Sequence, residues 1–181
     1  MTDGSASATL PGPTSSGALS TRRLGYAVTT ALLSGLMLLV VIDAFAPVAI
    51  LGVDTGTAEA SASEVDLRVT YGEATRPALA TPFDIEVRRE GGFDEPVRVA
   101  VDQEYLRMWD ENGLVPAPSA ETVMGPWVVW EFDPPIGDTL LITYDARIEP
   151  AAQDGRSGAV AVLGRDDAPI VQVEFTTRVL P

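Results

Sequence analysis

The chain contains no cysteine and no histidine, and each of its 12 basic residues is an arginine. Without cysteine there can be no disulfide, no thiol nucleophile, no thiolate metal site and no lipid attached through sulfur. Without histidine the chain lacks the commonest general base and the commonest transition-metal ligand. These absences argue against catalysis, so we predict a protein that is not an enzyme and that carries no cofactor.

Positive charge is also scarce, because 26 acidic residues face those 12 arginines and give a formal net charge of −14. A surface of this sign repels phosphate backbones and anionic lipid headgroups. The sequence has no glycine-rich phosphate loop and no dinucleotide fingerprint. We therefore expect no nucleic acid among its partners, and no small-molecule substrate is indicated.

One long apolar run, residues 24–53, contains a single charged residue, Asp43. At about 1.5 Å per helical residue, its first part, residues 24–42, is long enough to cross most of a hydrocarbon core about 30 Å thick. We predict a transmembrane helix that stays in place as a signal anchor.

The charges beside this run predict its orientation. Arg22 and Arg23 precede it, whereas no basic residue follows it until Arg68. By the positive-inside rule the N-terminus is cytoplasmic and the C-terminal domain extracellular, on a single-pass protein of the cell membrane. Arg22 and Arg23 also resemble a twin-arginine export signal, although Gly25 stands where such signals usually carry a bulky apolar residue.

The alternative to an anchor is a cleaved signal that releases a secreted domain. Residues 58–60 and 60–62 both resemble small-residue cleavage sites. Both lie far beyond Ile42, and the apolar core is longer than the usual h-region of a signal peptide. Length therefore favours the anchor.

Within the span, small residues recur at four-residue spacing and would form one stripe against which another helix could pack. Asp43 lies either at the outer interface, where water hydrates it, or in a polar contact with a partner. The predicted membrane-helix interface consists of Ala27, Ala31, Gly35 and Asp43. An interface of this kind implies an integral membrane protein as partner.

The sequence divides into four parts. Residues 1–21 are mostly small and polar and are expected to be a disordered cytoplasmic tail. Residues 22–53 are the transmembrane helix and juxtamembrane segment, and residues 54–63 read as a linker. Residues 64–181 are enough for one domain.

Apolar and polar residues alternate along most of this domain, which is the pattern of half-buried strands. The seven predicted strands are residues 65–71, 83–88, 97–101, 127–132, 140–148, 159–163 and 171–179. Short strands separated by turns rich in Gly and Pro predict an all-β domain, an immunoglobulin-like β-sandwich of about seven strands. A small open β-barrel is the second possibility.

The second and third of these strands are predicted to form a hairpin around a loop from Glu90 to Asp94. The register without a like-charge pair places Glu86 opposite Arg98 and Arg89 opposite Glu95.

Residues 103–126 are predicted to be a long connection without strands. Asp102 is a possible N-cap for one or two helical turns that end at Gly113, and the following residues read as irregular. Long loops are often functional, but Tyr105 and Trp109 could instead fill one end of the sandwich. The candidate binding residues of this loop are Tyr105, Met108, Trp109, Asp110, Glu111 and Asn112.

Three further chemistries have weak support. Residues 155–159 approach a serine nucleophile motif but lack its second glycine, so they read as a turn. Acidic residues at 110–113 and 166–167 could bind calcium, but neither group matches an EF-hand loop, and no metal site is predicted. No pair of carboxylates can be singled out for glycoside hydrolysis.

The segments WVVWEFDPP, GDTLLITYDARIEP and GRSGAVAVL, together with the tail and the single span, resemble small single-pass membrane proteins of high-GC bacteria that carry an extracytoplasmic β-sandwich. Some members of this group are encoded beside YetF-like multi-pass membrane proteins. The resemblance implies an accessory protein with an integral membrane partner, and it supplies no ligand residues. The alternative function is a cell-surface module that binds cell-wall polymer or protein.

Overall fold

The computed structural model describes residues 28, 32–34, 37 and 52–181. The chain divides into two units, Met1–Phe45 and Ala46–Pro181. In the first unit, the described residues are helical and exposed. The predicted tail and most of the predicted span, including Ala27, Ala31, Gly35 and Asp43, lie outside the described residues. Among those that are described, no helix has both the length and the apolar character needed to cross a membrane.

The second unit consists almost entirely of β-structure. In residues 52–181 the strands are β1 (Asp54–Ala62), β2 (Val65–Thr75), β3 (Phe83–Arg89), β4 (Val97–Asp102), β5 (Trp109–Val115), β6 (Ala120–Met124), β7 (Trp127–Phe132), β8 (Thr139–Ile148), β9 (Arg156–Leu163) and β10 (Pro169–Val179), with the short helix α2 (Gln103–Leu106) between β4 and β5. They follow the order β5-β8-β3-β2-β10-β9-β4-β7-β6, and β1 pairs with β2.

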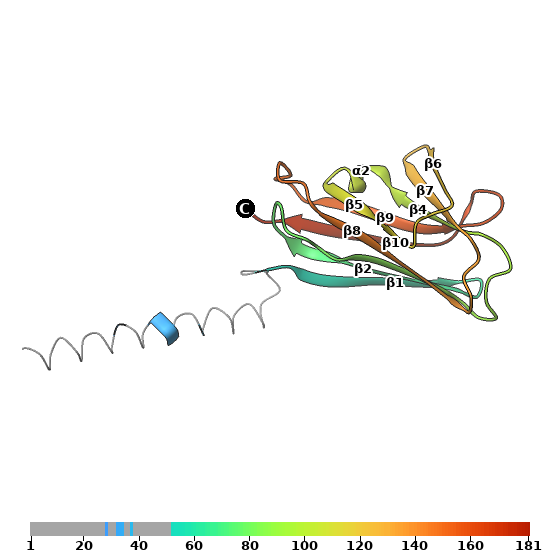
Figure 1. Cartoon of the computed structure of the whole chain (residues 1–181), viewed down its shortest axis with the longest axis horizontal. Coiled ribbons are helices and arrows are strands. Elements are labelled where there is room, and N and C mark those ends of the chain that lie inside the picture. The colour runs from blue at the N-terminus through green and yellow to red at the C-terminus, as the bar shows by residue number, and fades with distance from the viewer. Residues whose placement is uncertain (1–27, 29–31, 35–36, 38–51) are drawn as a thin grey trace, which may run out of the picture. The chain divides into compact units, whose positions relative to one another are not determined.

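This sheet curls into two layers (Figure 1). One layer contains β1, β2, β3, β8 and β5, and the other contains β10, β9, β4, β7 and β6. The layers are joined where β10 runs parallel to β2, with Arg178 opposite Ala74 and Val179 opposite Thr75. At the opposite margin the edges of β5 and β6 have no strand beside them in the described sheet. The β-sandwich architecture predicted from the sequence is confirmed, but with ten described strands in place of seven.

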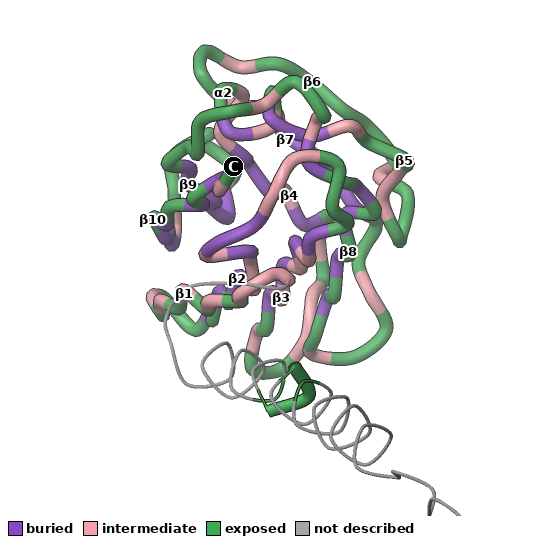
Figure 2. Tube along the Cα trace, turned by 90° about the vertical axis from the view of Figure 1, so that its left-hand side faces the viewer, coloured by how far each residue is buried: buried purple, intermediate pink, exposed green. Residues whose placement is uncertain are grey.

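Alternation along the strands builds the core. The inward side chains of both layers are buried and the intervening ones are exposed or half-buried, as the purple and green segments of Figure 2 show. Each fully buried aliphatic side chain contributes about 1.5–3 kcal/mol relative to leaving it in water.

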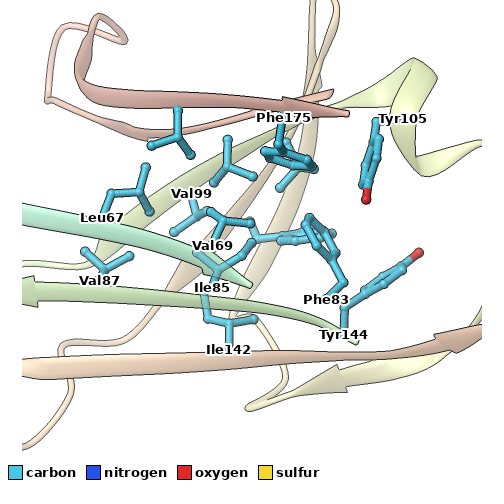
Figure 3. Close-up of a cluster of buried hydrophobic side chains, with 14 of the residues drawn as sticks. Leu67, Val69, Phe83, Ile85, Val87, Val99, Tyr105, Ile142, Tyr144 and Phe175 are labelled. Carbon is cyan, nitrogen blue, oxygen red and sulfur yellow. The ribbon is translucent and has the colours of Figure 1, made fainter. Parts of the chain in front are cut away.

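Aromatic side chains fill one end of this core. The ring of Phe83 lies 5.3 Å from Tyr105, 5.8 Å from Trp109, 5.8 Å from Tyr144 and 5.9 Å from Phe175, measured between centroids. In Figure 3 the rings of Phe83, Tyr105, Tyr144 and Phe175 lie on one side, while smaller aliphatic residues such as Leu67 and Val87 lie on the other. The two ends of the sandwich are therefore packed differently.

The seven predicted strands all exist, as β2, β3, β4, β7, β8, β9 and β10, and three more lie where none was expected. Residues 54–63, expected to be a linker, contain β1, which pairs with β2 over nine residues. Strands β5 and β6 occupy the segment expected to be helical and then irregular. The inward residues of β1 include Ala58, Ala60 and Ala62, whose short side chains pack against the core without giving a strong apolar signal.

The predicted hairpin is wrong. Strand β3 pairs with β2 and β8, whereas β4 pairs with β7 and β9 in the other layer. The connection between them crosses from one layer to the other, so Glu86 does not face Arg98 and Arg89 does not face Glu95. Alternation shows that each strand buries one face, and two strands that face each other across the core satisfy it as well as two paired strands.

Helix α2 is shorter than predicted. Its N-cap is confirmed, because the side chain of Asp102 accepts a hydrogen bond of 3.0 Å from the backbone N–H of Tyr105. The helix ends before Arg107, and Gly113 belongs to β5, beside a bulge.

Candidate functional site

The predicted binding loop is divided between the core and the surface. Tyr105, Met108 and Trp109 are buried, with exposed fractions of 0, 2 and 7%. The hydroxyl of Tyr105 shares a 2.9 Å hydrogen bond with that of Thr177 on β10. Tyr105 and Met108 therefore fill the interior, and Trp109 is buried beside them.

The other three predicted residues lie on the free edge strand β5. Asp110 forms an ion pair with Arg147 of β8 at 2.6 Å, and Asn112 is exposed beside it. Glu111 accepts a hydrogen bond of 3.3 Å from the hydroxyl of Tyr144. Of these three residues, Glu111 lines a recess, together with the buried Trp109.

That recess is the seam, the gap between the free edges of β5 and β6. It has a volume of about 250 Å³ and is lined by residues of both layers, Gln103, Leu106, Arg107, Trp109, Glu111, Glu121, Val128, Trp130 and Tyr144. Glu121 of β6 accepts a hydrogen bond of 3.2 Å from the indole N–H of Trp130. Each free edge thus carries one inward carboxylate held by an aromatic donor.

Electrostatics in the seam are dominated by burial and by these two acids. Burial raises the pKa of the Tyr144 phenol far above its ordinary value, and the nearby charges of Glu111 and Glu121 raise it further. An inward charge on an edge strand discourages another strand from pairing there. We interpret the two glutamates as protecting the free edges of β5 and β6.

The acidic turns considered for calcium have other contacts. Asp167 forms an ion pair of 2.6 Å with Arg98, and Asp166 accepts a hydrogen bond from the backbone N–H of Ala168. Within the described ranges, no group of three or more Asp or Glu side chains is positioned to hold a metal ion.

A large hollow lies at the aliphatic end of the sandwich. We call this space, of about 760 Å³, the distal hollow; it is lined by residues 64–65, 89–98 and 162–165, with Glu131 and Ile170. Strand β1 begins at Asp54 and ends at Ala62, next to the hollow. Because β1 has nine residues and a strand rises about 3.3 Å per residue, the hollow lies about 30 Å from the point where the chain enters the sandwich.

The floor of the distal hollow is apolar and its rim is charged. Val65, Val97 and Val162 are buried beneath it, and Phe93 is half-buried in the loop that crosses between the layers. On the rim Glu95 pairs with Arg165, with 2.6 Å between carboxylate oxygen and Nε.

Arg89 lies on the inward face of β3. It is opposite Val65 in the β2–β3 register and follows Ile85 and Val87 along the buried row. In the part of the chain that the structure describes, no carboxylate forms an ion pair with Arg89. Its neighbour Arg88 points outward and pairs with Asp138 at 3.2 Å.

The sequence does not reveal this hollow, because residues 90–94 were expected to form the tip of a hairpin. One signal was present, since Phe93 places an aromatic side chain inside a charged loop. The sequence did not predict that β3 and β4 lie in different layers, and this separation opens the space between them.

No protein-family model matches the chain, and no curated protein matches it. Among solved structures the chain is similar to a non-cellulosomal cohesin from the hyperthermophilic archaeon Archaeoglobus fulgidus. The two are 13% identical, the match covers 61% of this chain and 88% of the cohesin, and the TM-score is 0.34. A similarity at this level carries no argument about function.

Proposed function

We propose that the chain is a membrane-anchored extracytoplasmic binding protein that performs no catalysis. Residues 24–42 form the span, the N-terminus is cytoplasmic, and the sandwich is displayed outside the cell. The apolar run, its basic N-terminal flank and the acidic sandwich support this proposal.

One structural observation favours a retained anchor over a cleaved signal. Both candidate cleavage sites, residues 58–60 and 60–62, lie inside β1. Cleavage at either would detach most of a strand that pairs with β2 along its whole length and whose alanines pack against the core. A sandwich released in this way would expose the edge of β2.

The geometry also favours binding at the distal end. No linker separates the apolar run from the sandwich, because β1 begins at Asp54. The distal hollow lies at the far end of β1, about 30 Å along that strand from Asp54. This supports the module that binds cell-wall polymer or protein as a second role.

The first role is that of an accessory to an integral membrane protein. The stripe of Ala27, Ala31 and Gly35 offers a close helix contact for such a partner. Full-length chain purified in mild detergent is expected to carry the partner with it, and Ala31→Leu is expected to release it while Leu32→Ala does not. A wild-type chain that always elutes alone would contradict this role.

The anchor is tested by fractionation and mass measurement. We expect the tagged chain to sediment with membranes, to be extracted by detergent and not by alkaline carbonate, and to retain its residues from Met1 or Thr2. Protease added to intact cells should digest the sandwich. A soluble protein that begins near Ser61 would overturn the proposal.

A further inference from the structure

We propose that the distal hollow binds a ligand with one carboxylate next to an apolar group, and that Arg89 pairs with that carboxylate. The inference deepens the binding role proposed above and rests on it, because it names the chemistry that the distal end recognises.

The position of Arg89 is the first argument. Register in β2–β3 places Arg89 on the same face as Val87 and Ile85, which are 0 and 1% exposed. Arg89 thus ends the buried row of β3, where it lines the distal hollow. Arg88, one residue earlier, faces solvent opposite Asp66. The two arginines are adjacent in sequence but lie on opposite faces of one strand.

The second argument is the missing partner. Among the described residues, the arginines that form ion pairs with carboxylates include Arg68, Arg88, Arg98, Arg107, Arg147, Arg156, Arg165 and Arg178. Arg89 forms none, although acidic residues outnumber basic ones 26 to 12. Glu95, its predicted partner, is taken by Arg165. Arg89 is half-buried as a residue, and its unpaired guanidinium can donate two parallel hydrogen bonds to a ligand carboxylate.

The third argument is the shape and charge of the surroundings. A volume of about 760 Å³ lies in the range of pockets that hold small ligands or the end of a peptide. The rim carries Glu64, Glu90 and Asp94, which disfavour a doubly charged phosphate and leave a single carboxylate as the anion that one arginine can hold. Val65 and Val97 form the floor for the apolar part of the ligand.

The test uses the full-length chain in neutral detergent micelles, with N-acetyl-leucine as the probe. The backbone amide signals of Gly91 and Gly92, in the loop beside Arg89, report binding by NMR. We expect saturable shifts at millimolar concentrations of the acid and at least tenfold weaker binding of N-acetyl-leucinamide, which has the same side chain and no charge. Equal shifts with both probes, or none with the acid, would overturn the inference without any variant.

Two matched variants assign the binding to one residue. Arg89→Gln is expected to weaken binding of the acid at least tenfold, whereas Arg88→Gln, an identical change on the outward face, should leave it within twofold of wild type. Unchanged indole signals of the buried tryptophans establish that each variant is folded. If Arg89→Gln binds the acid as tightly as the wild type does, Arg89 does not pair with the carboxylate.

Two peptides separate the sources of the carboxylate. Acetyl-Ala-Ala-Leu offers a chain terminus, and acetyl-Ala-Glu-Leu-amide offers an acidic side chain; binding of the first alone assigns a C-terminus, and binding of the second alone a side chain. The result is independent of the anchor. If the chain binds the acid but is cleaved and secreted, only the proposed anchoring is overturned. If the chain is bound to the membrane but binds none of the carboxylates, only this inference is overturned.

Discussion

The ring of Tyr105 lies so close to Gly158 that a β-carbon built on the glycine would be 2.5 Å from the tyrosine Cγ. The tyrosine belongs to α2 and the glycine to β9, and the tyrosine hydroxyl reaches Thr177 on β10. One side chain therefore joins three elements at the aromatic end of the core, and the absence of a side chain at Gly158 makes that contact possible.

Gly158→Ala is expected to lower the free energy of unfolding by about 1–3 kcal/mol, the usual effect of overpacking a buried site. Ser157→Ala, on the next and exposed position of β9, should change it by less than about 0.5 kcal/mol. Urea unfolding of the detergent-solubilised chain, followed by fluorescence of the buried tryptophans, measures both. Equal stability of the two variants would mean that α2 moves aside freely.

The buried phenols predict a loss of stability at alkaline pH. Burial raises the pKa of Tyr105 and of Tyr144 far above the ordinary value near 10. The stabilisation is fully present below about pH 10 and is lost as pH rises above it, because the unfolded chain then releases protons that the folded chain keeps.

For Tyr105 the expected slope is up to about 1.4 kcal/mol per pH unit above pH 10. Tyr105→Phe should therefore unfold at lower urea at pH 8, because Thr177 loses its partner, yet show a shallower decline from pH 10 to 11.5 than wild type. Urea midpoints measured across this range are the readout. Parallel curves for the two proteins would show that the phenol ionises equally in both states.

Two adjacent glycines at the rim of the distal hollow make a matched pair. Gly91 and Gly92 both have positive φ, 86° and 88°. A β-carbon on Gly91 meets open space, whereas one on Gly92 would lie 3.0 Å from the carbonyl oxygen of Gly137. Gly91→Ala should therefore lower the free energy of unfolding only by the cost of a positive φ, about 1–2 kcal/mol. Gly92→Ala should lower it by more. Urea midpoints of the two variants that coincide would contradict the contact between these loops.

The inward carboxylates of the seam predict resistance to association. Replacing Glu111 and Glu121 together by valine should turn the edges of β5 and β6 into apolar templates for strand pairing and raise the oligomeric state with concentration. Glu174→Val, an exposed change on the outward face of β10, serves as control and should stay like wild type. Light scattering on size-exclusion fractions measures the mass, and a double variant that remains like the control would refute this role.

Strand positions could be predicted because large apolar residues alternate with polar ones along seven segments. β1 was not predicted because its inward residues include alanines, which are too weakly apolar to produce a clear alternation with outward residues such as Thr55 and Glu59. β5 and β6 were not predicted because Glu111 and Glu121 occupy inward positions, where the alternating pattern of a strand requires apolar residues. The helical spacing of Tyr105 and Trp109 was real for the first turn only, since the chain becomes extended at Trp109.

The distal hollow could not be predicted for a different reason. Alternation indicates which face of a strand is buried, but not which strand lies beside it. The sequence offered Glu95 as a partner for Arg89, and that pairing depended on β3 and β4 being neighbours in one sheet. Once the two strands face each other across the core, Glu95 is closer to Arg165 and Arg89 is left at the mouth of the hollow.

The place of β10 in the sheet order affects how the domain is made. It lies between β2 and β9, so the last of the ten described strands to be synthesised is the one that connects the two layers. A chain that leaves the ribosome or an export channel N-terminus first presents nine strands before their connector arrives. Assembly must wait for contacts between distant parts of the sequence, which is slow. During that interval the unjoined layers are open to chaperones and proteases, and the yield of the protein depends on which reaches them first.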